Sequence, residues 1–354
     1  MKPVDAPLHA PVSLTVRNYR SEDAARWEAF VLKCPEATFF HRIGWKEILE
    51  QVLHHRCHYL LAERDSQIVG VLPLAEVKSF LFGHALVSLP FAAYGGVAAD
   101  DPEVVSVLHE AAVWTARGLG VSHLELRDRA RKEPSWPQQD LYVTFRKEIQ
   151  PEVEANMLAI PRKQRAMVRK GIQRGLVSEI DQDIGRFFDV YSDNVHRHGT
   201  PALSKRYFEA LARVFGRDCE VLTVVSPQGK PVSSVLSFYF RDEVLAYYGG
   251  DLTDARDLAA NDFKYWELMR RACERGYRIF DYGRSKRDTG PFDFKKNWGF
   301  EPQQLAYEYK LLRRDSIPQN NPSNPKFQAF IAAWRRLPRP VVNTVGPWIV
   351  RSLG

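Results

Sequence analysis

The alternation of apolar and polar positions predicts short strands joined by helices along the first half of the chain. Residues 13 to 19 alternate as a half-buried strand does, and Ser21 begins a helix that carries Trp27 and Val31. Two further strand patterns flank the turn at residues 64 to 66, which is typical of a hairpin. The remaining predicted elements are a helix at 45–53, strands at 59–63, 67–74 and 87–91, a helix at 102–117 and a strand at 122–127.

The second half of the chain repeats this order of elements. It predicts strands at 220–225, 232–240 and 243–248, a helix at 261–274 and a strand at 278–282. Two landmarks recur about 155 residues apart: Tyr94-Gly95-Gly96 with Tyr248-Gly249-Gly250, and Leu124-Glu125 with Phe280-Asp281. Two landmarks in the same order at nearly one spacing indicate a duplicated unit, and its length is that of a domain rather than of a solenoid repeat.

Composition narrows the class of protein. A chain of 354 residues fits two domains, and 45% apolar with 12% aromatic content is globular. The net charge of +7 favours partners that carry phosphate. The four cysteines form no Cys-x-x-Cys pair, which argues against a zinc site or a disulfide framework and favours a reducing compartment. No signal peptide and no run of about 18 apolar residues is present, so we expect a cytoplasmic protein that is soluble or peripheral to a membrane.

The stretch from Phe280 to Gly299 carries the densest candidate chemistry. Five basic residues stand among aromatic ones there: Arg284, Lys286, Arg287, Lys295 and Lys296 with Tyr282, Phe292, Phe294 and Trp298. Cations beside aromatic rings suggest a lined pocket for a ligand that is anionic and partly apolar. The alternative is a basic loop whose aromatic side chains fold back onto the core.

Together with the repeat, this stretch resembles the FemA/FemB-like family of tandem acyltransferases. The motifs that carry the resemblance are Asp281-Tyr282-Gly283 and Phe294-Lys295-Lys296-Asn297-Trp298-Gly299, and they lie in the second repeat, as they do in the family. The resemblance spans residues 13 to 312 and is closest to the FemAB-like subgroup found with exosortase (PEP-CTERM) and exopolysaccharide systems. It implies an α/β (α+β) fold of two GNAT-like domains, each a mixed sheet flanked by helices, at 13–145 and 146–312. A loose arm at 1–12 and a tail at 313–354 complete the predicted organisation.

The resemblance implies transfer of an aminoacyl or acyl group to an amino group of a cell-envelope, peptidoglycan or exopolysaccharide precursor. No tightly bound cofactor is expected, and the donor is a co-substrate, either aminoacyl-tRNA or acyl-CoA. The long helical hairpin of members that use aminoacyl-tRNA is absent here, which weighs against tRNA. The glycine loop of GNAT proteins is also missing at 253–261, which weighs against acyl-CoA bound in the usual way. The alternative is a non-catalytic binding module of the same fold for a glycan-lipid or a nucleic acid.

The predicted site follows from the motifs and from a basic helix. Asp281 and Lys295 are the predicted catalytic pair, the first as a base and the second as a charge partner, although Asp281 could simply be a loop carboxylate paired with Arg284. Arg165 and Arg169 lie one turn apart in the basic window 156–175 and could hold a diphosphate, although such a window is most often a solvated face. The predicted substrate-binding residues are Arg165, Arg169, Tyr248, Arg284, Ser285, Lys296 and Trp298.

Two further segments carry candidate partners. His196 and His198 stand two residues apart at a helix end, a spacing that does not favour a metal pair, and no metal is expected. The tail from Phe327 to Gly354 is amphipathic and basic, with no acidic residue after Asp315, which suggests an anionic membrane surface at the inner face of the cytoplasmic membrane. Packing of Trp334 and Trp348 on a domain is the alternative. The expected acceptor is a nucleotide- or lipid-linked envelope precursor.

Overall fold

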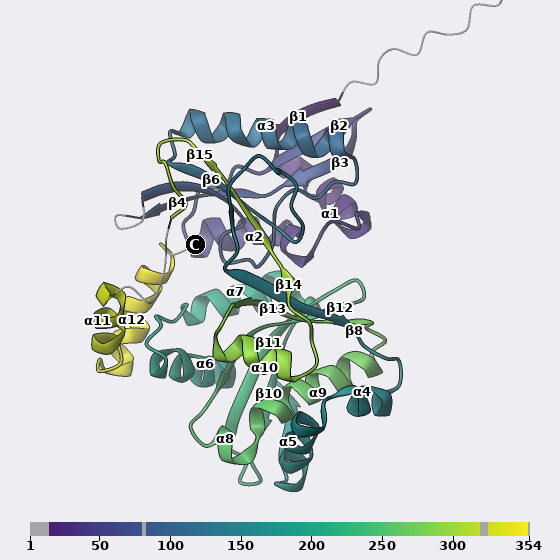
Figure 1. The fold of residues 1–354 in the computed structure, drawn as a ribbon, viewed down its shortest axis with the longest axis vertical. Coiled ribbons are helices and arrows are strands. Elements are labelled where there is room, and N and C mark those ends of the chain that lie inside the picture. The colour runs from purple at the N-terminus through teal and green to yellow at the C-terminus, as the bar shows by residue number, and fades with distance from the viewer. Residues whose placement is uncertain (1–13, 80–82, 319–324, 353–354) are drawn as a thin grey trace, which may run out of the picture.

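A computed structural model describes residues 14–79, 83–318 and 325–352 of the protein, in two α/β halves that stack on each other (Figure 1). The predicted arm at 1–12 and most of the linker before the tail helices lie outside the described residues. No helix within the described ranges is long and apolar enough to cross a membrane.

The first half contains a three-stranded sheet and a five-stranded sheet. The small sheet has the order β1-β2-β3, and the larger has the order β4-β5-β6-β15-β7. The strands are β1 (Leu14–Asn18), β2 (Leu60–Arg64), β3 (Gln67–Leu72), β4 (Leu74–Ser79), β5 (Gly83–Ser88), β6 (His123–Asp128), β7 (Gln138–Gln139) and β15 (Ala306–Leu311). The helices are α1 (Ala24–Lys33), α2 (Gly44–Glu47) and α3 (Pro102–Leu119). Asp101 caps α3 by accepting a hydrogen bond from the Glu103 amide, as a strong N-cap residue does.

The second half is built on one seven-stranded sheet of order β14-β8-β13-β12-β11-β10-β9. Its strands are β8 (Tyr142–Glu148), β9 (Val177–Ile180), β10 (Cys219–Val225), β11 (Pro231–Phe240), β12 (Glu243–Asp251), β13 (Ile279–Lys286) and β14 (Gln303–Gln304). Its helices are α4 (Val153–Ala159), α5 (Arg162–Gln173), α6 (Gly185–Arg197), α7 (Lys205–Phe215), α8 (Ala255–Leu258), α9 (Ala260–Glu274) and α10 (Gly290–Asn297). Two tail helices, α11 (Pro325–Trp334) and α12 (Arg339–Val350), follow beside α6 (Figure 1).

Each half contains one parallel strand pair joined by a helix, and the two pairs match residue by residue. In the first, Leu86 pairs with Leu124 and Val87 with Glu125; in the second, Val244 pairs with Phe280 and Leu245 with Asp281. The landmark Leu124-Glu125 is therefore equivalent to Phe280-Asp281, which supports the duplication. The predicted mixed α/β fold with two related units is confirmed.

The two glycine tripeptides, in contrast, are not equivalent. Gly249 and Gly250 pair with β11 inside β12, whereas the amides of Gly95 and Gly96 both donate to the Arg127 carbonyl from a loop beyond β5. That loop contains Leu89 and Phe91 at φ of 53° and 67°. These residues in the left-handed conformation end β5. The tripeptide of the first copy therefore follows its strand, whereas that of the second copy lies within β12.

The two halves exchange strands. β8 pairs with β13 in the sheet of the second half, and β15 pairs with β6 in the sheet of the first half. The predicted boundary between residues 145 and 146 therefore lies inside β8. Strand pairing of this kind joins segments far apart in sequence, and no local pattern signals it.

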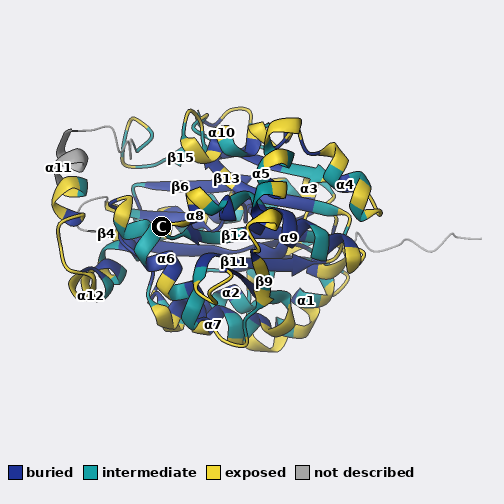
Figure 2. Ribbon diagram, turned by 90° about the horizontal axis from the view of Figure 1, so that it is seen from below, coloured by how far each residue is buried: buried dark blue, intermediate teal, exposed yellow. Residues whose placement is uncertain are grey.

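The sheet of the second half is covered on both faces, and successive side chains along its strands are buried in two different cores. Val244 and Ala246 of β12 belong to the core beneath α9, while Leu245 belongs to the core shared with the first half. Successive side chains of a strand point to opposite faces, so one strand contributes to both cores. Figure 2 shows these buried strands in the centre and the exposed helices outside them.

Candidate active site between the two halves

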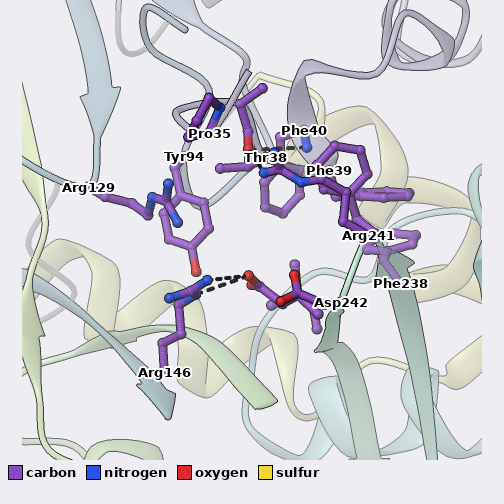
Figure 3. Close-up of a pocket in the computed structure, with 14 residues that line it drawn as sticks. Pro35, Thr38, Phe39, Phe40, Tyr94, Arg129, Arg146, Phe238, Arg241 and Asp242 are labelled. Carbon is purple, nitrogen blue, oxygen red and sulfur yellow. Dashed lines mark hydrogen bonds and ion pairs between the residues drawn. The ribbon is translucent and has the colours of Figure 1, made fainter. Parts of the chain in front are cut away.

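A cavity of about 200 Å³ lies where the first half meets the start of β12. The segment 35–40 and Tyr94 line it from the first half, and β8, β11 and β12 line it from the second. Its aromatic wall is rigid, because the rings of Phe39 and Phe238 stack with centroids 4.3 Å apart. The polar lining comprises Thr38, Tyr94, Arg129, Arg146, Arg241, Asp242 and Glu243 (Figure 3).

Glu243 is one of the two carboxylate residues that line this cavity, the other being Asp242. Both hydrogen bonds from Arg146, from Nε at 3.0 Å and from a terminal nitrogen at 2.9 Å, go to Oε2 (Figure 3). The other oxygen, Oε1, has no hydrogen-bond partner among the described residues. Burial raises the pKa of Glu243 from 4.5 to about 7, and the charge of Asp281 adds to this, while Arg146 opposes it. A carboxylate with such a pKa can take up and release a proton near neutral pH.

Arg129 is a cation of the cavity wall whose side chain has no carboxylate partner among the described residues. It lies beside Tyr94 and forms no ion pair within the ranges that the structure describes. Arg241, in contrast, is used to hold the wall, because it donates to the carbonyl of Cys34 at 2.8 Å and to that of Ala37. A half-buried arginine with no acidic partner is available to bind an anionic group of a ligand.

Asp281 lies directly behind the cavity and is completely buried. One of its oxygens accepts from the Gly283 amide at 2.6 Å and from Thr144 Oγ1 at 3.1 Å, and the other accepts from the Tyr94 hydroxyl. Tyr94 comes from the first half and Thr144 from β8, so Asp281 ties the two halves together at the bulge of β13. The predicted base is thus enclosed between the two halves and holds the hydroxyl of Tyr94, a residue of the cavity wall.

Lys295 lies on the other side of the same bulge. Its Nζ donates to the carbonyls of Tyr282, Gly283 and Arg284 at 2.7, 3.1 and 3.4 Å. These carbonyls lie where β13 departs from regular pairing, so the lysine satisfies groups that the sheet leaves open. Burial lowers the pKa of Lys295 from 10.5 to about 7, with the charge of Asp281 opposing the shift. The structure therefore brings the predicted pair, Asp281 and Lys295, to one bulge.

The other predicted residues of this stretch separate into packing and surface positions. Trp298 is buried and donates from Nε1 to Asp262 at 2.9 Å, and Ser285 Oγ is buried without a partner among the described residues. Arg284 lies over the Tyr142 ring at 4.5 Å and donates to the Tyr307 hydroxyl at 3.1 Å. Lys296 is exposed on α10.

Tyr248 and the basic helix lie away from the cavity. The Tyr248 hydroxyl is 2.9 Å from that of Tyr207, within an aromatic cluster on α6 and α7. Arg169 is exposed on α5, and Arg165 donates to the Leu158 carbonyl at 3.0 Å. Figure 1 shows α5 at the end of the second half that is furthest from the first half. The structure does not bring Arg165 and Arg169 to the cavity.

The start of α9 corresponds to the place where the sequence lacks the GNAT glycine loop. The short helix α8 precedes it, and Ala259 at φ 58° leads into α9. Asp262 occupies the first turn, where burial raises the pKa of its carboxyl. Across the described ranges, no three His, Cys, Asp or Glu side chains are grouped as metal ligands.

The sequence analysis did not select the residues that line the cavity, among them Glu243, Arg146 and Arg129. Glu243 and Arg146 are 97 positions apart and meet only because β8 joins the second sheet. The alternation of β12 was a usable signal, since it places Glu243 on the same face as Leu245, whereas Val244 lies on the other.

Comparisons with known proteins agree with this architecture. Residues 160–296 match the family model of the acetyltransferase (GNAT) domain. Among solved structures, FemX has a TM-score of 0.66 at 16% identity, covering 84% of this chain and 98% of its own. The C-terminal domain of a putative lysylphosphatidylglycerol synthetase from Agrobacterium fabrum has a TM-score of 0.56 at 15% identity, covering 92% of this chain and 96% of its own.

A tandem GNAT protein from the clavulanic acid biosynthesis pathway gives a TM-score of 0.51 at 13% identity, covering 86% of this chain and 100% of its own. No curated protein is significantly similar in sequence. The predicted resemblance to FemA/FemB-like proteins is thus confirmed at the level of the fold.

Proposed function

We propose that this protein, whose fold is that of FemX and of tandem GNAT proteins, is an N-acyltransferase that works in the cavity between its two halves. The observation that carries the proposal is Glu243, a carboxylate on the cavity wall with one unpartnered oxygen and a pKa of about 7. Attack of an amine on an activated acyl carbon requires removal of a proton from nitrogen, and a base of this pKa suits that step at neutral pH.

The amine of the acceptor is the nucleophile. Its nitrogen forms a bond to the acyl carbon, and Oε1 of Glu243 takes the proton that the nitrogen loses. The bond from the acyl carbon to the leaving oxygen or sulfur of the donor then breaks, and the proton passes from Glu243 to that leaving group. Arg146 keeps the carboxylate in place through two hydrogen bonds to Oε2, so that Oε1 stays directed to the reactants.

The size of the cavity limits what part of the acceptor enters. A volume of about 200 Å³ is below the range of about 300–1,000 Å³ that holds a whole small-molecule ligand. We therefore propose that only the amine-bearing end enters, while Arg129 binds an anionic group further along the acceptor. This fits a nucleotide- or lipid-linked cell-envelope precursor with a phosphate some distance from its amino group, as in peptidoglycan or exopolysaccharide synthesis.

The donor is an activated acyl group, carried either by tRNA or by coenzyme A. The start of α9 offers no glycine loop and carries Asp262, whose charge disfavours a pyrophosphate there. The same observation favours the second candidate, a binding module that kept the cavity and lost transfer. For both candidates we propose a cytoplasmic location.

The decisive experiment supplies both donor types and amine-terminated, phosphate-bearing envelope precursors, and follows acylated product by mass spectrometry. Glu243→Gln should lower the transfer rate about 10²- to 10⁴-fold, the usual contribution of a general base, with acceptor affinity nearly unchanged. Asp257→Asn, on the exposed surface of α8, is the matched control and should transfer at the wild-type rate. Binding of a precursor without transfer from either donor supports the binding module instead.

A further inference from the structure

The two tail helices fold back onto the second half at the end of α6. The Trp334 side chain is buried, and its backbone carbonyl lies 3.2 Å from His196 Nε2. Arg335 donates to the His198 carbonyl at 3.2 Å, and the side chain of Ile331 fills the space above Gly199. The two histidines at the end of α6 therefore belong to the surface on which the tail helices pack, here called the seat.

Helix α12 has two apolar faces, and only one of them is used by this packing. Val342, Gly346 and Val350 are buried, and Gly346 lies against the backbone of Ala202. The other face is exposed and consists of Val341, Val345 and Trp348. Positions three and four apart lie on one side of a helix, so these three residues form one continuous strip, here called the tail strip.

The charged side chains of the tail helices are all positive. Arg351 lies over the Trp348 ring at 4.3 Å, and Arg336 is exposed without an ion pair in the described part of the chain. Arg339 is turned inward, toward Asp193 at 3.8 Å. No acidic residue follows Asp315 in the sequence, so the tail itself supplies nothing to neutralise these arginines.

Exposure alone does not distinguish the tail strip. Trp114 on α3 is 78% exposed, more than the 63% of Trp348, yet α3 also carries exposed acidic residues such as Glu103 and Glu110. The tail strip differs because its tryptophan continues an aliphatic row and is flanked by arginines. Tryptophan favours the headgroup level of a bilayer, and arginine can lay its apolar stem along the acyl boundary while its charge meets lipid phosphate.

We propose that the tail strip is a docking site for an anionic membrane surface. Val341, Val345 and Trp348 enter the boundary between headgroups and acyl chains, and Arg336 and Arg351 pair with acidic headgroups. The seat on α6 holds α12 in place, so the strip is presented as a fixed, preformed face. The proposal does not depend on acyl transfer, since a catalytically inactive chain would bind in the same way.

The test is co-sedimentation of the full-length protein with vesicles of phosphatidylcholine mixed with phosphatidylglycerol, and with vesicles of phosphatidylcholine alone. Binding should be strong on the mixed vesicles, weak on the neutral ones, and reduced by added salt. Trp348→Ser should weaken the partition coefficient about tenfold, because a large apolar side chain no longer enters the lipid. Arg336→Ala should weaken it about fivefold, the loss of one basic residue near an anionic surface.

The matched controls remove an exposed tryptophan and an exposed arginine elsewhere. Trp114→Ser on α3 and Arg217→Ala, whose side chain is 96% exposed, should partition as the wild type does. The proposal is overturned if Trp348→Ser binds as well as Trp114→Ser, or if the protein binds neutral vesicles equally. It is also overturned if sedimentation velocity shows a dimer that Trp348→Ser dissociates, because the tail strip would then be an interface between two copies.

Discussion

Replacement of Glu243 by glutamine should make the protein more stable at alkaline pH while it removes the proposed base. The folded state raises the pKa of this carboxyl from 4.5 to about 7, so the folded protein binds a proton more tightly than the unfolded chain does. Stability from this group is therefore present below pH 4.5 and is lost as the pH rises through 7. Glutamine resembles the protonated carboxyl and does not titrate.

The magnitude follows from the same shift. One pKa unit corresponds to about 1.4 kcal/mol, so full ionisation of Glu243 costs the folded state at most about 3 kcal/mol. Because the side chain is 19% exposed and paired with Arg146, we expect about 1 to 3 kcal/mol. The stability advantage of Glu243→Gln over the wild type should be near zero at pH 4.5 and should reach this range above pH 8.

Urea denaturation of both proteins across this pH range measures the difference directly. The Asp257→Asn protein is the control, because it makes the same change from carboxyl to amide at an exposed position of α8 outside the cavity. A difference between wild type and Glu243→Gln that stays constant from pH 4.5 to above pH 8 would refute the raised pKa, and with it the reason for choosing Glu243 as the base.

Three further outcomes are expected. Lys295→Ala should lower the free energy of unfolding by about 2 to 4 kcal/mol in denaturation experiments, because it leaves three carbonyls at the β13 bulge without their donor; an unchanged value would contradict this. Tyr94→Phe should cost about 1 to 3 kcal/mol by losing the hydrogen bond to Asp281, and a neutral result would mean that this bond does not tie the halves. Arg129→Ala should weaken binding of a phosphate-bearing acceptor by about 1 to 3 kcal/mol in calorimetry, whereas the control Arg169→Ala, on the exposed surface of α5, should leave the affinity unchanged.

The sequence predicted those parts of the fold that depend on local pattern. The hairpin of β10 and β11 and the unit β12-α9-β13 follow from apolar alternation and from the helix between two strands, and both are present. The exchange of β8 and β15 was not predicted, because each strand pairs with a segment far away in the chain. Local pattern carries no information on such partners.

The candidate site shows the same division. Asp281 and Lys295 were found through a motif, and they do lie together at the β13 bulge. What the motif could not indicate is that Asp281 is fully buried while Glu243 faces the cavity. Access of this kind depends on how the first half packs on β12, and it follows from the tertiary structure alone.

The exchange of β8 and β15 has a mechanical consequence. A two-lobed protein whose lobes are joined by one linker can open by rotating about it, but here two strands run in opposite senses between the lobes, each hydrogen-bonded into the far sheet. Rotation would have to break one of these ladders, so closure by lobe movement is disfavoured. Substrates must pass the segment 35–40 to reach Glu243. We therefore expect this loop to move when substrate enters, while the two halves keep their relative position.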